Sequence, residues 1–153
     1  MSWQHLRLCD SRIAMLVLLA MLPLAAVSSA LHIGRMQSTA VKGVLMCNNQ
    51  PAANVKVKLY DDDIGIDDLM AQGRTDAYGH FTLEGHTAEF TTIDPKVNIY
   101  HKCEHKKVCS RKVTFWVPKT YVSKGKIPKK IYDMGVIQLA LKYKGESVDC
   151  LHR

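Results

Sequence analysis

The chain is built from short segments in which apolar and polar residues alternate. Alternation with β-branched and aromatic residues is typical of strands that pack on one face and meet water on the other. The alternation over Val55–Tyr60 is the cleanest, with valine or leucine at every second position. The segments that show it are 41–47, 55–60, 80–84, 96–100, 112–117 and 136–142. Each is predicted to be a strand.

Turn-forming residues separate these segments at short intervals. They are concentrated at 48–51, 76–79 and 94–95, and Pro118 closes the fifth segment. The spacing predicts an all-β fold, an antiparallel β-sandwich of about seven strands. At most one short helix is expected, at 67–71, with a short connector at 121–126. Residues 31–39 are predicted to form a poorly ordered arm.

The first thirty residues have the pattern of a secretory signal peptide. Arg7 and Arg12 precede an uncharged run over 13–27, which contains Pro23, and small residues follow up to Ala30. The run is shorter than the ~20 residues that a membrane-spanning helix needs. We therefore expect cleavage after Ala30, a secreted and extracellular location, and a domain at 31–153 that does not span a membrane.

Cleavage changes the cysteine count and the charge. The full chain has 153 residues, five cysteines and a formal net charge of +7. Cys9 would leave with the signal peptide, and the charge would fall by one. Four cysteines would remain, and an even number favours a disulfide framework. Four cysteines can be paired in three ways. Because Cys103 and Cys109 flank one short loop, we predict the pairs Cys103–Cys109 and Cys47–Cys150.

Several segments in order carry a family resemblance. They lie at 37–47, 51–61, 68–70, 75–76 with 79–81, 89–91, 94–96, 100–103 (Tyr-His-Lys-Cys), 145–146 and 149–150. This order and spacing resemble the nematode transthyretin-like protein family over about 33–150. The resemblance implies a transthyretin-like (prealbumin-like) sandwich and secretion. It also implies roles in carrying small or hydrophobic ligands, in bridging to extracellular lipids or proteins, or as an effector if the source is a parasitic nematode.

The acidic run 61–68 is a candidate for metal binding. Asp61, Asp63 and Asp67 supply the hard oxygen ligands that calcium prefers. The EF-hand pattern fails, because position 12 counted from Asp61 is Gln72 rather than glutamate. A solvated loop without metal is the main expectation, and a calcium site is the alternative.

The basic residues are concentrated between 102 and 130, where ten lysines and arginines face one acidic residue, Glu104. We predict one cationic region that binds an anionic lipid headgroup or an acidic protein. A solvated face that only maintains solubility is an equal alternative. The residues expected to contact the partner are Lys102, Lys106, Lys107, Arg111 and Lys112.

Other chemistry lacks its signature. The Tyr-Arg-Gly-Ser end of the related hydroxyisourate hydrolases is absent, and so is a Gly-x-Ser-x-Gly elbow. His101 and His105 lie four apart around Cys103, a weak pattern for a metal site. No cofactor is expected, and a secreted protein without an aromatic stacking platform is not expected to bind nucleic acid. Trp116 and Tyr60 occupy the outward phase of their strands, where a second sheet or a loop is expected to cover them. The alternative is that they line a ligand or partner surface.

The sequence therefore predicts a secreted, disulfide-bonded, non-enzymatic binding protein. The alternative function is that of a carrier for a small hydrophobic or hormone-like ligand. A hydrolase is the least favoured hypothesis.

Overall fold

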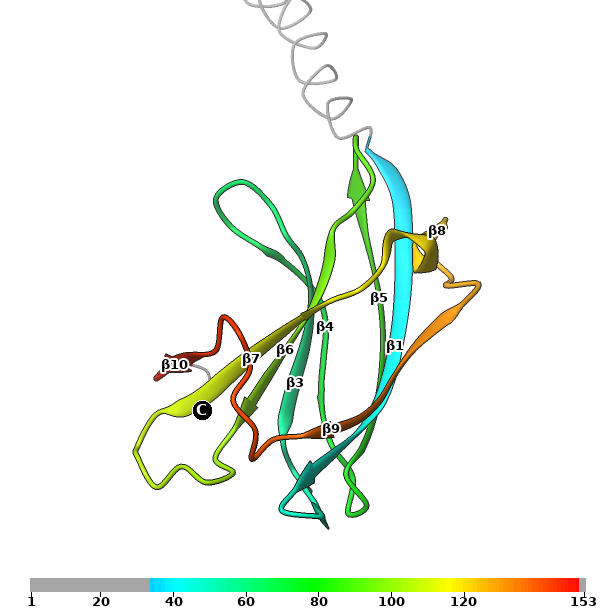
Figure 1. Cartoon of the computed structure of the whole chain (residues 1–153). Coiled ribbons are helices and arrows are strands. Elements are labelled where there is room, and N and C mark those ends of the chain that lie inside the picture. Colours follow the sequence, from blue (N-terminus) through cyan, green and yellow to red (C-terminus); the bar gives the residue numbers. More distant parts are fainter. Residues whose placement is uncertain (1–33, 152–153) are drawn as a thin grey trace, which may run out of the picture. The chain divides into compact units, whose positions relative to one another are not determined.

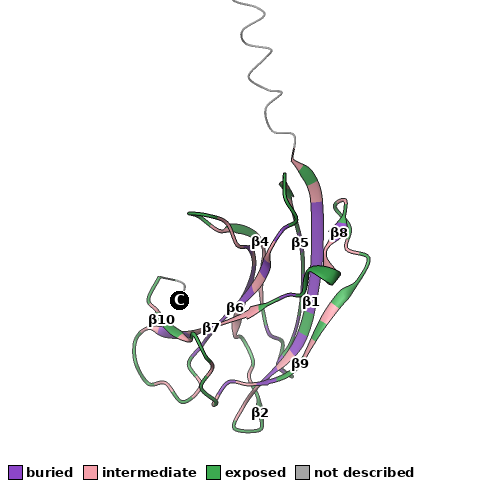
Figure 2. Cartoon of the chain, turned by 45° about the horizontal axis from the view of Figure 1, so that its top comes forward, coloured by how far each residue is buried: buried purple, intermediate pink, exposed green. Residues whose placement is uncertain are grey.

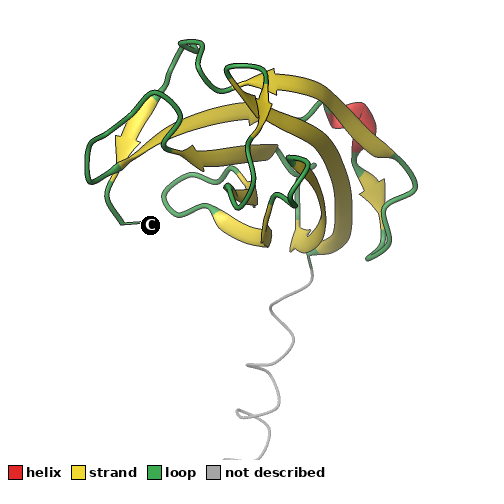
Figure 3. Ribbon diagram, turned by 90° about the horizontal axis from the view of Figure 1, so that it is seen from below, coloured by secondary structure: helices red, strands yellow, loops and turns green. Residues whose placement is uncertain are grey.

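The computed structural model describes residues 34–151, so the predicted signal peptide and its cleavage site lie outside the described residues. Seven strands of six residues or more make up about half of the described chain (Figures 1 and 3). They are β1 (Arg35–Cys47), β3 (Lys56–Asp61), β4 (Asp68–Arg74), β5 (His80–Glu89), β6 (Pro95–His101), β7 (Ser110–Trp116) and β9 (Ile131–Gln138). Shorter elements are β2 (Gln50–Pro51), β8 (Ser123–Lys124), β10 (Ser147–Asp149) and the 3₁₀ turn η1 (Lys119–Tyr121). The predicted all-β sandwich is confirmed.

The strands form two five-stranded sheets. The first is ordered β2-β1-β5, and β8 and β9 also pair with β1. The second is ordered β10-β7-β6-β3-β4, and all its pairs are antiparallel. In the first sheet β9 pairs with β1 in parallel, from Ala40–Ile131 to Met46–Gln138. The parallel pair is possible because the chain first runs antiparallel to β1 in β8 and then reverses its direction before β9 begins.

The core lies between the sheets and follows the predicted alternation. Val57 and Leu59 of β3 are fully buried, as are Val97 and Ile99 of β6. Figure 2 shows the long buried stretch of β1 in the other sheet. Buried residues of the first sheet complete the same cluster: Val41, Leu45, Phe81, Leu83 and Ile137. Burying such side chains contributes about 1.5–3 kcal/mol each, which fixes the strand register.

Two local predictions were wrong. The segment 67–71 is not a helix, because residues 68–71 belong to β4, whose backbone pairs with β3 from Lys56–Arg74 to Asp61–Asp68. The arm predicted at 31–39 is ordered from Arg35, because β1 pairs with β5 from that residue onward. In both cases strand pairing outweighs the local preference. The connector predicted at 121–126 begins at the last residue of η1 and contains the short strand β8.

Within the described residues, there is no helix of the length and hydrophobicity needed to cross a bilayer.

Candidate functional site

The loop between β6 and β7, residues 102–109, is held by two disulfides. Cys103 bonds to Cys47 at the end of β1, with 5.7 Å between their Cα atoms, and Cys109 bonds to Cys150 just after β10, with 4.4 Å. The loop is therefore tied to both sheets. We call residues 102–109 the disulfide-held loop.

The predicted pairing of these four cysteines was wrong. The β7–β10 ladder ends at Ser110 and Asp149, so one further step places Cys109 opposite Cys150. Cys103 packs instead against the core, where the end of β1 brings Cys47 to it. Proximity in the sequence favoured a Cys103–Cys109 bond, but neighbouring strands supply both cysteines with other partners.

The lysines of the disulfide-held loop are exposed. The Lys102 side chain closes the loop internally, because its Nζ donates a hydrogen bond to the carbonyl of Val108 at 2.8 Å. Lys106, Lys107 and Val108 are all exposed, with Val108 at 66% of its free surface. Lys112 is half-buried on β7, opposite Tyr100 on β6. The loop thus presents two lysines and one apolar side chain on a braced backbone.

Arg111 does not belong to this surface, contrary to the prediction. The residue is 7% exposed, and its Nε and Nη2 donate to the two carboxylate oxygens of Glu146 at 2.6 Å each. Its guanidinium also donates to the backbone carbonyls of Cys103, Leu139 and Leu141. The hydrogen bonds to Glu146 raise the pKa of Arg111, and those from Arg111 lower the pKa of Glu146. Arg111 therefore joins β7 to the disulfide-held loop and to the segment 139–146.

A buried histidine lies beside this ion pair. His101 is 3% exposed, and neither ring nitrogen has a hydrogen-bond partner among the described residues. Burial lowers its pKa to about 4, and the positive charge of Arg111 acts in the same direction. His101 is therefore neutral at physiological pH. No metal-ligand cluster in residues 34–151 includes it or His105.

The other half of the predicted cationic region lies elsewhere. Lys119 is in η1 and Lys124 in β8, beside the first half of β1, whereas the disulfide-held loop follows the far end of β6 (Figure 1). Lys119 also pairs with Asp94 at 2.7 Å. The ten cations of 102–130 therefore do not make one surface, because β7 carries the chain from the disulfide-held loop to η1 and β8 beside the first half of β1.

The group of carboxylates around Asp61 and Asp63 does not include Asp67, which pairs with a lysine. Asp67 accepts an ion pair from Lys96 at 2.8 Å, and Asp62 pairs with the same ammonium. Burial would raise the pKa of Asp67, but the hydrogen bond and charge of Lys96 outweigh it, so the pKa is lowered. The Lys96 ammonium also lies 5.7 Å from the ring centre of Trp116. Trp116 is thus exposed rather than covered by another element, and it is already in contact with a cation.

Asp61 and Asp63 instead lie close to a residue that the sequence did not single out as a ligand. Carboxylate oxygens of Asp61, Asp63 and Glu89 lie within 4.8 Å of one another. Glu89 is the last residue of β5, 26 positions after Asp63 in the sequence but adjacent in the fold. Its only sequence signal was its place in the resemblance segment at 89–91.

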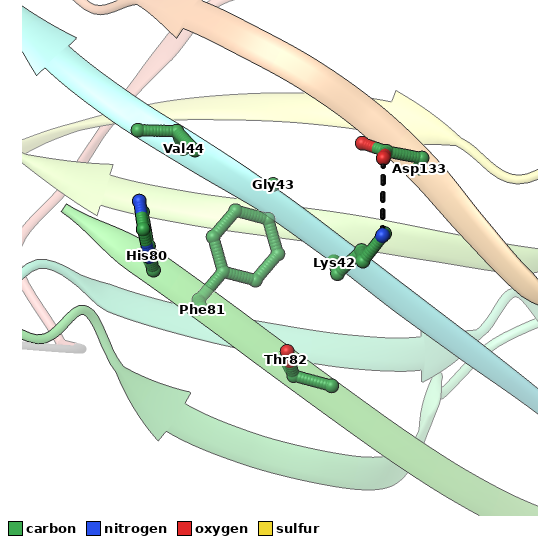
Figure 4. A pocket seen from close by; sticks show the side chains of 7 residues that line it. All are labelled: Lys42, Gly43, Val44, His80, Phe81, Thr82 and Asp133. Atoms are coloured by element: carbon green, nitrogen blue, oxygen red, sulfur yellow. Dashed lines mark ion pairs between the residues drawn. The ribbon is translucent and has the colours of Figure 1, made fainter.

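A surface pocket of about 240 Å³ lies between β1, β5 and β9 (Figure 4). Lys42 and Asp133 form an ion pair of 3.3 Å across it, and the ring of Phe81 lies beneath Gly43. A Cβ at Gly43 would come within 3.0 Å of that ring, so glycine allows the close approach. Polar and apolar groups contribute about equally to the lining, which therefore differs from the mainly apolar pocket that the carrier hypothesis predicts.

Comparison with known proteins identifies the family. The sequence profile of the Transthyretin-like family matches residues 42–118. The chain belongs to the transthyretin-like family. Transthyretin-like protein 33 of Caenorhabditis elegans is 56% identical over 120 residues, which cover 76% of this chain and 84% of the relative. Transthyretin-like protein 5 of the same organism is 54% identical over 138 residues, covering 88% and 99%.

The family resemblance seen in the sequence is thereby confirmed, and the two-sheet sandwich is a transthyretin-like fold. A solved 9R-lipoxygenase from Cyanothece has a TM-score of 0.39 and 19% identity over 67% of this chain and 16% of the lipoxygenase. That likeness is too low to bear on function.

Proposed function

We propose that this transthyretin-like chain is a secreted, non-enzymatic binding protein that uses the disulfide-held loop to bind an anionic extracellular partner. The observation that carries the proposal is the bracing of that loop. Two disulfides and the Lys102–Val108 hydrogen bond hold a segment whose Lys106 and Lys107 are exposed. A preorganised cationic loop loses little conformational entropy when it binds.

The signal-peptide pattern and the disulfides support the secreted location. Disulfides persist in oxidising compartments, and a signal peptide ending at Ala30 would deliver the chain there. Intact mass measurement of the protein from culture medium tests this step. The expected mass is that of residues 31–153 with both disulfides formed, and retention of residues 1–30 would contradict it.

The two partner chemistries that the cationic loop fits are an anionic lipid headgroup and an acidic protein surface. Each basic residue close to an anionic bilayer contributes about 1 kcal/mol. Lys106 and Lys107 together should then contribute about 2 kcal/mol, close to thirtyfold in affinity. Flotation with vesicles of phosphatidylserine in phosphatidylcholine measures the first partner, and cross-linked capture of extracellular proteins measures the second.

The decisive variant is Lys106→Glu with Lys107→Glu. Its control is Lys124→Glu with Lys126→Glu, which makes the same charge change beside β8. We expect the first pair to abolish partner binding and the second to weaken it much less, because long-range attraction falls off within a Debye length of about 8 Å. Equal effects of both pairs, or no effect of the first, would exclude the disulfide-held loop as the binding surface.

A further inference from the structure

The β3–β4 loop meets the end of β5 at a group of three carboxylates. Asp61 ends β3 in the second sheet, Asp63 follows it, and Glu89 ends β5 in the first sheet. Three oxygens no more than 4.8 Å apart can all lie within about 2.8 Å of one centre, close to the 2.3–2.6 Å of calcium–oxygen bonds.

Asp61 gives a second and independent indication of a ligand. The residue is 1% exposed, and its Oδ1 accepts a hydrogen bond from the backbone N–H of Asp94 at 2.7 Å. Its Oδ2 is buried and has no hydrogen-bond partner among the described residues. A buried carboxylate oxygen without a donor costs about 1–3 kcal/mol or more, so such oxygens are usually satisfied by a cation or a donor.

The two neighbouring lysines are engaged elsewhere. Lys96, the nearest ammonium on β6, pairs with Asp62 and Asp67. Lys119 pairs with the side chain of Asp94. Arg35 lies opposite Glu89 in the β1–β5 register but is exposed.

Local hydrogen bonds fix the backbone around Glu89. The Gln37 side chain, which is buried, donates from Nε2 to the carbonyl of Thr91 at 2.6 Å. Its Oε1 accepts from the N–H of Ile93 at 3.4 Å. The turn that follows β5 is thus anchored to β1, which holds Glu89 in place beside the β3–β4 loop.

We propose that Asp61, Asp63 and Glu89 form a calcium site that joins the two sheets. Carboxylates are hard oxygen ligands, which favour calcium or magnesium over zinc or copper. Calcium fits better, because it accepts irregular geometry and completes six to eight ligands with water and carbonyls, whereas magnesium demands a near-ideal octahedron. With three protein carboxylates, the expected Kd lies in the range of extracellular modules, about 0.1–1 mM.

The site does not depend on the proposed lysine surface. A bound ion would link the β3–β4 loop to β5 and order residues 62–67, whose tip carries the exposed Ile64 and Ile66 (Figure 1). The disulfide-held loop follows the opposite end of β6 and shares no residue with the site.

Calcium titration of the purified secreted protein tests the proposal. Isothermal titration calorimetry should give one site, and amide chemical-shift changes should centre on Asp61, Asp63 and Glu89. Glu89→Gln and Asp63→Asn should each weaken calcium binding at least tenfold. The matched controls are Glu84→Gln, on the same strand, which should leave Kd unchanged, and Asp68→Asn, in the same acidic run. Asp68→Asn removes a charge near Asp63 but no ligand, so it should weaken binding no more than about threefold.

The melting temperature supplies a readout that needs no ligand assay. Calcium should raise it in the wild type and both controls but not in the two ligand variants, and circular dichroism without metal should be the same for all five proteins. Absence of binding up to about 10 mM calcium, far above the expected Kd, would overturn the proposal. Binding that survives both Glu89→Gln and Asp63→Asn would also overturn it, because the ion would then lie elsewhere.

Discussion

Replacement of Arg111 by methionine tests whether this residue stabilises the fold rather than contacts a partner. The arginine side chain is 9% exposed and makes two 2.6 Å bonds to Glu146 as well as bonds to three backbone carbonyls. Methionine keeps most of the apolar stem and adds little strain. The change therefore removes the charge and the five hydrogen bonds together.

The expected loss of stability is large. Breaking a buried ion pair by removing one partner costs about 3–5 kcal/mol, because the other charge is left without compensation. The Glu146 side chain is more exposed than that of Arg111, at 19%, and can turn toward water. The loss of the ion pair alone should therefore cost an amount near the lower end of that range. The three carbonyls left without a donor add to the cost. We expect a total of about 3–5 kcal/mol, or a fall of roughly 10–20 °C in melting temperature.

Guanidinium denaturation followed by circular dichroism measures this change. The control Lys106→Met removes an exposed cation from the disulfide-held loop and should cost less than about 0.5 kcal/mol. A double-mutant cycle with Glu146→Gln should show coupling of at least about 1 kcal/mol. If Arg111→Met lowers the free energy of unfolding no more than Lys106→Met does, the guanidinium does not stabilise the fold. Arg111 would then again be a candidate for contact with a partner.

Two further predictions concern the same end of the molecule. Cys109→Ala with Cys150→Ala removes a bond that closes a 41-residue separation and should cost about 4 kcal/mol in the chain-entropy model. Non-reducing peptide mapping should find Cys109 linked to Cys150, and a Cys103–Cys109 peptide would contradict the structure. His101→Phe should remove a pH dependence: burial lowers the folded pKa to about 4, so only the unfolded chain takes up a proton as pH falls from 6.5 to 4. The wild type should therefore lose roughly 2–3 kcal/mol relative to the variant over that range, and parallel pH profiles would refute the assignment.

The hydrophobic alternation predicted the core because strand burial is a local property. Val57, Leu59, Val97 and Ile99 were placed on the packed face from period two alone, and all four are fully buried. The alternation was less informative where the strand is irregular. The last strand was expected at 136–142 but spans Ile131–Gln138, because Gly135 adopts a positive φ of 65° and the β1–β9 register shifts beside it.

The disulfide pairing could not be deduced in the same way. It depends on β10, whose three residues show no usable periodicity, and on the end of β1 meeting a core-facing Cys103. Loop length favoured the short Cys103–Cys109 bond, and nothing in the local sequence opposes it. The order of the strands determines the pairing instead. Because β7 lies between β6 and β10, Cys109 just before β7 lies beside Cys150 just after β10.

Charge in a stretch of sequence also differs from charge on a surface. The segment 102–130 looked uniformly basic, yet Arg111 points inward to Glu146, Lys119 pairs with Asp94, and Lys102 closes its own loop. The same holds for the acidic run: Asp67 pairs with Lys96 of β6, and β5 brings Glu89 close to Asp61 and Asp63. In a sandwich each strand meets neighbours that are distant in sequence, so side chains clustered along the chain are separated and distant ones are joined. The residues able to bind a ligand are therefore to be sought among those that remain exposed or unsatisfied after the strands have paired. Lys106 and Lys107 are of the first kind, and the Asp61 carboxylate is of the second.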